Sequence, residues 1–424
     1  MVALARHLAA IREAGVFCAY NANVDAIVDV DGDVEDALDP PHDRELDRIE
    51  SPADLATAIV RTMERGEGDE IAAAESFEGW FGANLRADER RLGGQAGIMA
   101  DFLSLAGATP ILYTYLLSDA QRSTFRDPET VLFPVVDGGL QFRPLSSAPT
   151  AAETKTNWIF EFDRGTRLFG TTATESTRLI AASRPEAFDL ETGGLAAHAR
   201  ELGRRVDCAI LSGYHSLKAE YADGTTDADH LESGRRFLSE LGRETTVQVE
   251  YGVTHDEALR EAIVERIAPL ADVVSVDVRE LGLLAADLGV GPPDDDVRAH
   301  RDALREVREA LGVRAVKLHA REYFLAVTDG YLPPERVREG FRFAAVVAAA
   351  KATHGRLADP SQLDDGAAVE PSAAGAEAAA AVAEDADVVA VPNRVVEDET
   401  GTVGIGDVVS CSSFALEQAL SAGE

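Results

Sequence analysis

The sequence has few cysteines, and they are too far apart to act together. Three occur in 424 residues, at Cys18, Cys208 and Cys411. These spacings exclude a local metal-binding motif. Isolated, reduced cysteines are typical of cytoplasmic proteins, so we expect three small core residues in a cytoplasmic chain.

The sequence also lacks a long apolar run, which excludes a transmembrane helix. One of its longest apolar stretches, residues 343–350, ends at Lys351. Near the N-terminus, residues 3–14 include three charged side chains, so this segment is predicted to be an ordinary helix and not a signal peptide. We therefore expect no membrane partner.

Lysine is scarce as well, because only Lys155, Lys218, Lys317 and Lys351 occur and the other bases are arginine. Acids dominate: 75 Asp and Glu against 40 Lys and Arg give a formal net charge of −35. The acids are spread along the chain, unlike an acidic tail, and this charge argues against nucleic-acid binding. Their repulsion destabilises a compact state at low salt, but molar salt shortens the screening length to about 3 Å. The charge therefore predicts a salt-adapted, halophilic protein.

From about residue 206 onward, short apolar runs alternate with longer amphipathic segments. Five runs are predicted to be buried strands: residues 206–211, 246–250, 273–276, 315–318 and 388–391. Helices are predicted between most of them, over residues 229–241, 256–267 and 297–310. This alternation indicates an α/β fold with a doubly wound, mostly parallel sheet covered on both faces.

Polar side chains follow four of these strands: Ser212, Glu250, Asp277 and His319. Ligands of open α/β sheets bind at the carboxyl ends of the strands. We therefore expect the functional site at that edge of the sheet.

A chain of this length is expected to form two domains. Residues 21–31 and 155–172 have β-rich patterns that fit a smaller lid sheet. We assign residues to a large domain and a small lid. The large domain takes residues 1–20, 92–145 and 178–424. The lid takes residues 21–91 and 146–177.

The strongest local motif is Thr402-Val403-Gly404-Ile405-Gly406-Asp407, followed by a predicted helix over residues 408–420. Glycines let the backbone approach a ligand, and amides at a helix start form a positively polarised cup for phosphate. Asp407 at its lip can accept a proton from a hydroxyl group. The alternative is a glycine-rich turn in which Asp407 only caps the helix.

A second motif, Asn21-Ala22-Asn23-Val24-Asp25, follows the apolar run of residues 16–19. Asn21, Asn23 and Asp25 share one face of an extended segment. Amides and a carboxylate arranged in this way offer both donors and acceptors to a polyhydroxylated ligand. A simple turn is the alternative.

A third motif, Arg91-Leu92-Gly93-Gly94-Gln95-Ala96-Gly97, places a double glycine before an Ala-rich helix. The glycines permit close backbone approach, and Gln95 adds a hydrogen-bonding group. An ordinary helix start is the alternative.

The order of these three motifs resembles the archaeal ADP-dependent glucokinase/phosphofructokinase family of the ribokinase-like superfamily. Weaker matches in the lid segment and at Ser212-Gly213-Tyr214 extend the resemblance over most of the chain. It implies a ribokinase-like α/β domain that binds nucleotide and a smaller lid that binds sugar. It also implies an Mg²⁺-dependent kinase that transfers the β-phosphoryl group of ADP to a sugar hydroxyl, giving AMP and a sugar phosphate.

The resemblance also assigns roles to single residues. Asp407 would be the catalytic base, with Gly404 and Gly406 in the anion hole. The sugar would be held by polar positions of the other two motifs: Asn21, Asn23, Asp25, Gly94 and Gln95. Arg167, in the place of the family's NRF-type arginine, would contact the donor phosphate or the transferred group, because a guanidinium fork suits phosphate oxygens.

Two magnesium-associated motifs of the family are altered here. Its H-x-E becomes Gln248-Val249-Glu250, and its N-x-x-E becomes Asp277-Val278-Arg279-Glu280. Mg²⁺ needs only a carboxylate or two besides water and phosphate oxygens, so the resemblance makes Glu280, Glu250 and Asp277 candidate ligands. Asp277 and Glu280 also have the spacing of a helix capping box.

The choice of sugar is less well defined. Glu70 falls where glucokinase-type members have a sugar-contacting glutamate, and a carboxylate there would repel a sugar phosphate. Gln95 also favours glucose. Asn157, however, stands where glucokinases have histidine, and Lys155 with Arg164 or Arg167 would bind a 6-phosphate. Glucose is therefore the favoured acceptor and fructose 6-phosphate the second.

Two alternatives stay open at this point. One is an ATP-dependent sugar or nucleoside kinase of the same fold, because the sequence does not distinguish the donor. The other is a sugar- or nucleotide-binding regulator weakened in catalysis by the changes at Gln248 and Asp277. The oligomeric state is also left open.

Overall fold

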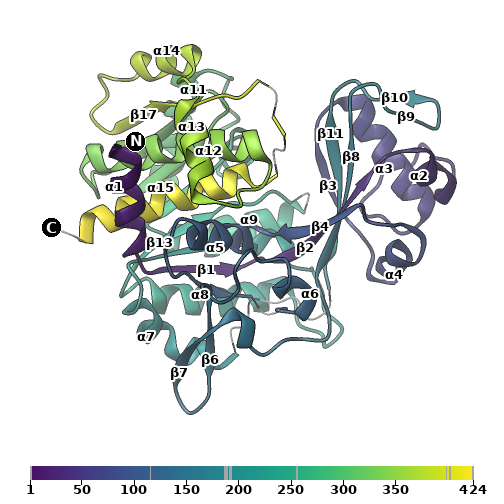
Figure 1. The fold of residues 1–424 in the computed structure, drawn as a ribbon, viewed down its shortest axis with the longest axis horizontal. Helices are drawn as coiled ribbons and strands as arrows, with labels where there is room; N and C mark the ends of the chain where they lie inside the picture. Colours follow the sequence, from purple (N-terminus) through teal and green to yellow (C-terminus); the bar gives the residue numbers. More distant parts are fainter. Residues whose placement is uncertain are drawn as a thin grey trace.

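The structure is a computed structural model that describes residues 2–114, 116–185, 190, 193–254, 256–397, 399–400 and 403–422. It has a larger and a smaller lobe, joined side by side (Figure 1). No helix within the described residues is long and apolar enough to cross a membrane. Thr402 of the C-terminal glycine motif lies outside the described residues.

The larger lobe is built on a ten-stranded sheet with the order β17-β16-β15-β14-β13-β12-β1-β5-β6-β7. Its strands are β1 (Val16–Tyr20), β5 (Ile111–Tyr113), β6 (Leu132–Val136), β7 (Leu140–Pro144), β12 (Cys208–Ser212), β13 (Thr246–Glu250), β14 (Val273–Val276), β15 (Ala315–His319), β16 (Tyr323–Thr328) and β17 (Val388–Pro392). The central strands from β15 to β6 are parallel, and antiparallel pairing occurs only at the two edges. The predicted α/β fold with a mostly parallel sheet is confirmed.

Helices cover both faces of this sheet. One face packs against α1 (Val2–Arg12), α5 (Gln95–Leu105), α12 (Pro334–His354) and α15 (Ile405–Ala422). The other face packs against α7 (Ala199–Gly203), α8 (Asp227–Leu241), α9 (Glu257–Arg266), α10 (Val278–Asp287) and α11 (Val297–Leu311). The apolar run at residues 343–350 lies inside α12, which packs along α15. All three cysteines are buried and unpaired, as expected.

The smaller lobe contains a five-stranded sheet in the order β3-β11-β8-β2-β4. These strands are β2 (Asn23–Asp29), β3 (Asp69–Ala72), β4 (Glu89–Gly93), β8 (Thr156–Phe162) and β11 (Thr177–Ala182). One face buries apolar side chains against α3 (Pro52–Arg65) and α4 (Glu75–Asn84). The strand pairing places Asp25 beside Asn157 and Arg91 on the opposite face, where the sheet is polar.

Local sequence signals explain the ends of α3. Ser51 caps its N-terminus by accepting a hydrogen bond from the backbone N–H of Asp54, and Pro52 occupies the first turn. Gly66 ends the helix with φ +71°, a left-handed conformation that favours glycine. This helix supplies most of the apolar cover of the small sheet.

Short elements complete the chain. These are α2 (Gly32–Ala37), α6 (Asp119–Arg122), α13 (Leu363–Ala368), α14 (Ala373–Ala381) and the hairpin of β9 (Arg167–Leu168) with β10 (Thr171–Thr172).

The lobe boundaries differ from the expected ones at two places. β11 pairs with β8 and β3 of the small sheet, so residues 178–182 belong to the smaller lobe and not to the larger one. β4 likewise extends the small sheet to Gly93. The sequence pattern missed these ends because strand pairing, and not composition, decides to which sheet a short apolar run belongs.

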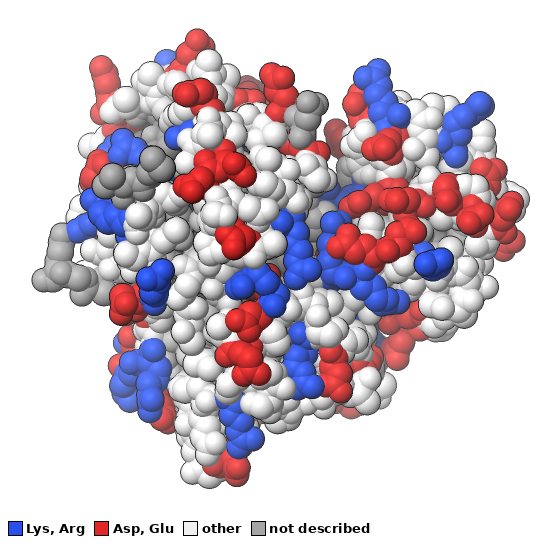
Figure 2. All heavy atoms as spheres, viewed as in Figure 1, with Lys and Arg blue, Asp and Glu red and all other residues white. Residues whose placement is uncertain are grey.

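The molecular surface carries its acids on both lobes. On the face shown in Figure 2, Asp and Glu side chains are interspersed with Arg and Lys and do not form a single block. A formal net charge of −35 on this surface produces repulsion that low-salt buffer does not screen.

This charge gives a test of the predicted salt adaptation. We expect the urea midpoint of unfolding to rise steadily as KCl is raised from about 0.1 M to about 2 M, because the screening length falls from about 10 Å towards 3 Å. Sucrose at equal osmolality is the control, since it does not screen charge. A midpoint that stays constant or falls with KCl would contradict the prediction.

Candidate active site

A polar cleft of about 370 Å³ lies between the polar face of the small sheet and the larger lobe. It brings together eleven of the residues that the sequence singled out: Asn21, Asn23, Asp25, Glu70, Gly94, Gln95, Asn157, Asp277, Glu280, Gly404 and Asp407. The C-terminal glycine motif and the N-terminal polar motif therefore face one cleft, although they are nearly 400 residues apart in the chain.

The N-terminal motif forms the floor of the cleft. Asn21 accepts a hydrogen bond from Nζ of Lys155 at 2.9 Å, and Nδ2 of Asn23 donates to Oδ1 of Asp25 at 2.6 Å. Burial raises the pKa of Asp25 to about 6, while the Asn23 hydrogen bond and the nearby Arg91 oppose this shift. Oδ1 of Asn23 and Oε1 of Gln95 are buried acceptors without a partner among the described residues, as expected of groups that bind ligand hydroxyls.

The double glycine allows α5 to begin directly against this floor. A Cβ at Gly93 would lie 2.1 Å from Oδ1 of Asp25, and one at Gly94 would lie 2.7 Å from the carbonyl oxygen of Asn21. Gly94 also has φ +77°. The backbone N–H of Ala96 donates to that same Asn21 carbonyl at 2.9 Å. These contacts fix the polar floor relative to the start of α5.

The phosphate cup is formed by the start of α15. Gly404 has φ +74°, and its Cα packs against Ile98 so closely that a Cβ would lie 2.9 Å from the Ile98 Cδ1 atom. A Cβ at Gly406 would lie 2.9 Å from Nε2 of His319. A side chain at either position would displace Ile98 or His319, so the two glycines allow these side chains to pack directly against the start of α15. α15 runs for 18 residues, long enough to have a substantial dipole.

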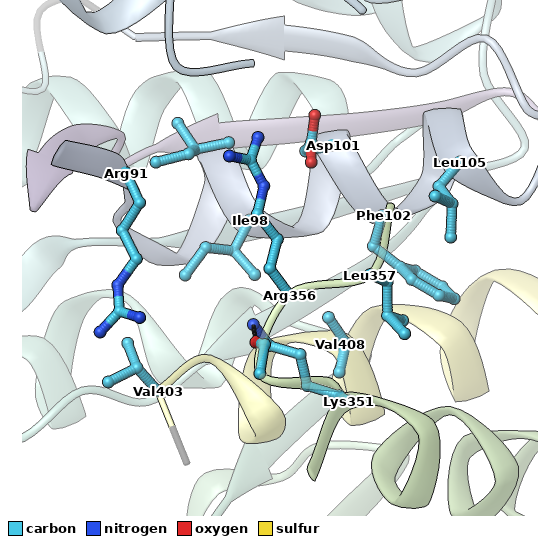
Figure 3. Close-up of a pocket in the computed structure, with 12 residues that line it drawn as sticks. Arg91, Ile98, Asp101, Phe102, Leu105, Lys351, Arg356, Leu357, Val403 and Val408 are labelled. Carbon is cyan, nitrogen blue, oxygen red and sulfur yellow. Dashed lines mark hydrogen bonds between the residues drawn. The ribbon is translucent and has the colours of Figure 1, made fainter. Parts of the chain in front are cut away.

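Asp407 lies in the first turn of α15 and lines the cleft. Burial raises the pKa of its carboxyl group to about 7, with Lys351 lowering it and Asp25 raising it further. A carboxylate with a pKa near neutrality is well matched to accepting a proton. Figure 3 shows Lys351 with Arg91 and Arg356 around a small cavity of about 60 Å³ beside Val403 and Val408, next to the cup.

The candidate metal ligands lie close to the cup. Asp277 and Glu280 form the capping box of α10, with hydrogen bonds of 2.7 and 2.8 Å between each side chain and the other's backbone N–H. Both side chains also line the cleft, so the cap does not remove them from it. Glu250 is buried behind the cleft, where it accepts hydrogen bonds from Ser410 and Ser275.

These acids repel one another. The pKa of Glu280 is raised well above its usual value by burial and by Asp277, Glu250 and Asp407. Burial and Asp407 raise the pKa of Glu250 to about 8. Within the described residues no three acidic, histidine or cysteine side chains form a ready-made metal site. Asp277 and Glu280 line the cleft, so a cation there would have two carboxylates within the protein and would need other oxygen ligands besides.

A second cavity of about 320 Å³ lies on the other side of the cup. It is lined by His319, Arg321, Phe324, Asn393 and Gly406 among others. Its mixture of apolar and polar walls fits a nucleotide base and ribose. Gly406 and Asp277 border this cavity, and Asp277 also borders the polar cleft, so the cup lies where the two spaces meet.

The structure does not place Arg167 in the cleft. Arg167 is an exposed residue on the β9–β10 hairpin of the smaller lobe, and it does not line the cleft. Arg178 on β11 lines it instead. Thr177-Arg178-Leu179 offered a competing match to the family's arginine pattern, one segment later in the chain, and strand alternation places it on the polar face of the sheet.

Three cations, Lys155, Arg178 and Arg184, lie within electrostatic range of Glu70. Arg178 lines the cleft, and Arg184 lines the adjoining cavity, which shares Asp69 and Glu70 with the cleft. The sequence had suggested only Lys155 of these three. Burial lowers the pKa of Lys155 to about 8 and also lowers the pKa values of Arg178 and Arg184. Nη1 of Arg184 donates to the carbonyl of Leu217 at 3.2 Å, and Glu70 is the first electrostatic partner that opposes its shift. No sequence motif indicated Arg184, because it lies in the irregular segment that follows β11.

Comparison with known proteins identifies the family. The model described as the ADP-specific Phosphofructokinase/Glucokinase conserved region matches residues 14–416. An ADP-specific phosphofructokinase of Pyrococcus furiosus is 30% identical over 442 residues, covering 95% of this chain and 97% of the relative. An ADP-dependent glucose/glucosamine kinase of Pyrococcus abyssi is 28% identical over 445 residues, covering 96% and 95%.

Comparison with solved structures points to the same family. An ADP-dependent kinase in complex with fructose-6-phosphate and ADPβS has a TM-score of 0.87 at 28% identity, covering 99% of this chain and 96% of that one. The class of the protein is thus an ADP-dependent sugar kinase, as predicted. The chain belongs to the ADP-specific phosphofructokinase/glucokinase family.

The close contact at Gly94 can be tested by Gly94→Ala. We expect the free energy of unfolding to fall by about 1–3 kcal/mol, because a left-handed backbone and a 2.7 Å Cβ contact both oppose the new methyl group. Urea unfolding at fixed KCl measures the change. Gly79→Ala in α4 is the control, since its Cβ meets nothing within 4 Å. Equal stability of the two variants would show that the approach at Gly94 is not constrained.

Proposed function

We propose that the protein transfers the β-phosphoryl group of ADP to a hydroxyl of a hexose, giving AMP and a sugar phosphate. One observation carries this proposal: Asp407 and the glycine cup share a cleft with Asn23 and Asp25. A hydroxyl bound by the polar floor would thus lie near both a base and an anion hole. The fructose-6-phosphate and ADPβS complex of a similar structure supports the same pair of substrates.

Fructose 6-phosphate is the acceptor that the electrostatics favour. Burial depresses the pKa values of Lys155, Arg178 and Arg184, so each of these cations would gain from an anionic partner in the cleft. A 6-phosphate supplies such a partner, and guanidinium groups bind it through two parallel hydrogen bonds. This reverses the preference for glucose that Glu70 and Gln95 suggested.

Glucose is the second candidate, because Glu70 lines the cleft. Its carboxylate can accept hydrogen bonds from the hydroxyls of a neutral sugar. Glu70 also lies within electrostatic range of both Lys155 and Arg184, so it partly neutralises the phosphate-binding end. A site that combines a carboxylate with three cations fits both a neutral and a phosphorylated hexose.

Catalysis would proceed by proton removal and charge stabilisation. Asp407 would accept the proton of the attacking hydroxyl, which the floor residues hold in place. The amides of residues 404–407 would stabilise the charge on the transferred phosphoryl group. Closure of the smaller lobe would exclude water as a competing acceptor.

Magnesium is proposed as the metal. Asp277 and Glu280 would hold it at the edge of the cleft, and Glu250 would support the cup from behind through Ser410. Mg²⁺ would neutralise charge on the donor phosphates. Gln248, which replaces a histidine of the family pattern, donates to Ser410 at 2.7 Å and so belongs to the same buried network.

Removal of the base is the first test. We expect Asp407→Asn to lower kcat by at least about 100-fold, while the dissociation constant for the sugar changes little, because a positioned base acts mainly in the transition state. Coupled detection of AMP measures turnover, and calorimetry measures sugar binding. Asp364→Asn, at an exposed position, is the matched control. A variant with near-normal turnover would exclude Asp407 as the base.

The pH profile is the second test. The pKa of Asp407 is raised to about 7, and the base acts only when it is deprotonated. We therefore expect kcat/KM to increase as pH rises through about 7 and then to level off. Residual activity of Asp407→Asn should lack this rise. A profile that already levels off below about pH 5 would contradict the raised pKa.

Sugar selection is the third test. We expect Arg184→Gln to raise the KM for fructose 6-phosphate by about 10- to 100-fold, the effect of losing a charged hydrogen bond, and to alter the KM for glucose much less. Glu70→Gln should have the opposite effect: it should raise the KM for glucose and alter the KM for fructose 6-phosphate much less. Arg167→Gln is the control for the arginine and Glu67→Gln, at an exposed position, for the glutamate. Equal effects on both sugars would contradict the assignment of either residue.

A further inference from the structure

A separate cavity of about 540 Å³ lies at the junction of the two lobes, outside the catalytic cleft. The smaller lobe contributes Val24 and Arg90 to its wall. The larger lobe contributes residues 123–126, which follow α6, and Arg356, which follows α12. In Figure 2, Lys and Arg side chains gather on this face where β4 and α6 approach each other.

Three arginines converge on this cavity without carboxylate partners. Nη2 of Arg126 donates to the Ser104 hydroxyl at 2.9 Å, and Nη2 of Arg356 donates to the Thr124 carbonyl at 2.8 Å. Arg90 lies over the Trp158 ring, 5.7 Å from its centre. Within the described part of the chain, none of the three forms an ion pair, and the buried Nε of Arg126 has no acceptor. Asp101 and Asp359 offset part of the charge of Arg126, and Asp101 part of that of Arg356, but no carboxylate forms an ion pair with these arginines within the described residues.

Two carboxylates lie within electrostatic range of Arg126, but the hydrogen bonds that they accept come from backbone N–H groups and a hydroxyl. Oδ1 of Asp101 accepts a hydrogen bond from the backbone N–H of Arg126 at 2.8 Å. Oδ1 of Asp359 accepts hydrogen bonds from the backbone N–H and the hydroxyl of Ser361. Neither acid binds a guanidinium group at this site.

More cations line the small cavity next to the phosphate cup. It shares Arg356 with the junction cavity and is lined also by Arg91 and Lys351 (Figure 3). The pKa of Lys351 is lowered to about 8, first by burial and then by repulsion from Arg91 and Arg356, while Asp407 and Asp101 oppose this shift. Arg91 itself forms an ion pair with Glu161 at 2.8 Å. An anion bound beside these cations would be attracted by all of them.

This cluster is unusual for the chain, in which acids outnumber bases by 75 to 40. Solubility at high salt does not by itself explain why Arg90, Arg126 and Arg356 lie together without an ion pair among the described residues. Guanidinium groups bind phosphate oxygens through a planar fork. The hydroxyls of Ser123 and Thr124 on the same wall donate to the carbonyls of Ala120 and Gln121, so the arginines are the donors that this wall offers to an anion. The volume is sufficient for a phosphate group with a small organic part.

We propose that a small phosphate-bearing anion, either inorganic phosphate or a phosphomonoester, binds in this junction cavity between Arg90, Arg126 and Arg356. Because Arg90 belongs to the smaller lobe and the other two arginines belong to the larger one, the bound anion links the lobes. Its binding does not depend on the kinase activity, so the site can be tested independently of the proposed reaction.

The test is thermal unfolding of the full chain in potassium phosphate against potassium chloride, at constant ionic strength. Binding to the native state raises Tm, because it adds RT ln(1 + [L]/Kd) to the free energy of unfolding. We expect phosphate to raise Tm in the wild type and in the control Arg164→Gln, an exposed arginine of the smaller lobe. The apparent affinity should fall at least about tenfold in Arg126→Gln/Arg356→Gln. It should fall at least about threefold in Arg90→Gln, whose exposed side chain makes misfolding no concern.

Arg184→Gln locates the binding, because it removes a phosphate-binding group of the catalytic cleft only. The phosphate effect should persist in this variant. Loss of the effect in Arg184→Gln together with its retention in Arg126→Gln/Arg356→Gln would overturn the proposal, as would the absence of any phosphate effect in the wild type. Glycerol 3-phosphate in place of inorganic phosphate distinguishes the two sources: an equal or larger effect identifies a phosphomonoester, and no effect identifies inorganic phosphate.

Discussion

The site depends on the close approach of two backbone segments at the double glycine. Gly93 and Gly94 leave no room for a side chain beside Asn21 and Asp25, and the N–H of Ala96 donates to the Asn21 carbonyl. This contact anchors the polar floor of the smaller sheet to α5 of the larger lobe. α5 in turn carries Ile98, which packs against Gly404 of the phosphate cup. The acceptor floor and the phosphate cup are thus held to the same helix.

Burial gives the site its chemical properties. The cleft raises the pKa of Asp407 to about 7 and that of Asp25 to about 6, while it lowers the pKa of Lys155 to about 8. Both effects have the same cause, because burial removes water from a charged group. The buried carboxylate becomes a better base, and the buried cation is stabilised more by a bound phosphate. In a chain with a formal net charge of −35, these grouped cations are the places where we propose that anions bind.

The sequence predicted those parts of the fold and site that local patterns encode. Apolar runs gave strands β13 and β14 with their full bounds, and the glycine motifs gave the floor and the cup. It misplaced what depends on pairing between distant segments. Arg178 reaches the cleft only because β11 joins the small sheet, and strand β16, between β15 and β17, was not predicted. Asp277 and Glu280 show that a capping box and a place in the cleft are compatible.

The most direct measurement is product analysis with the purified protein in molar KCl, with Mg²⁺, ADP and fructose 6-phosphate. Transfer from the cup to a hydroxyl on the polar floor predicts equimolar AMP and a doubly phosphorylated sugar. It also predicts that ATP at the same concentration gives a much lower rate. Absence of AMP at saturating substrates, or a faster reaction with ATP, would contradict the account.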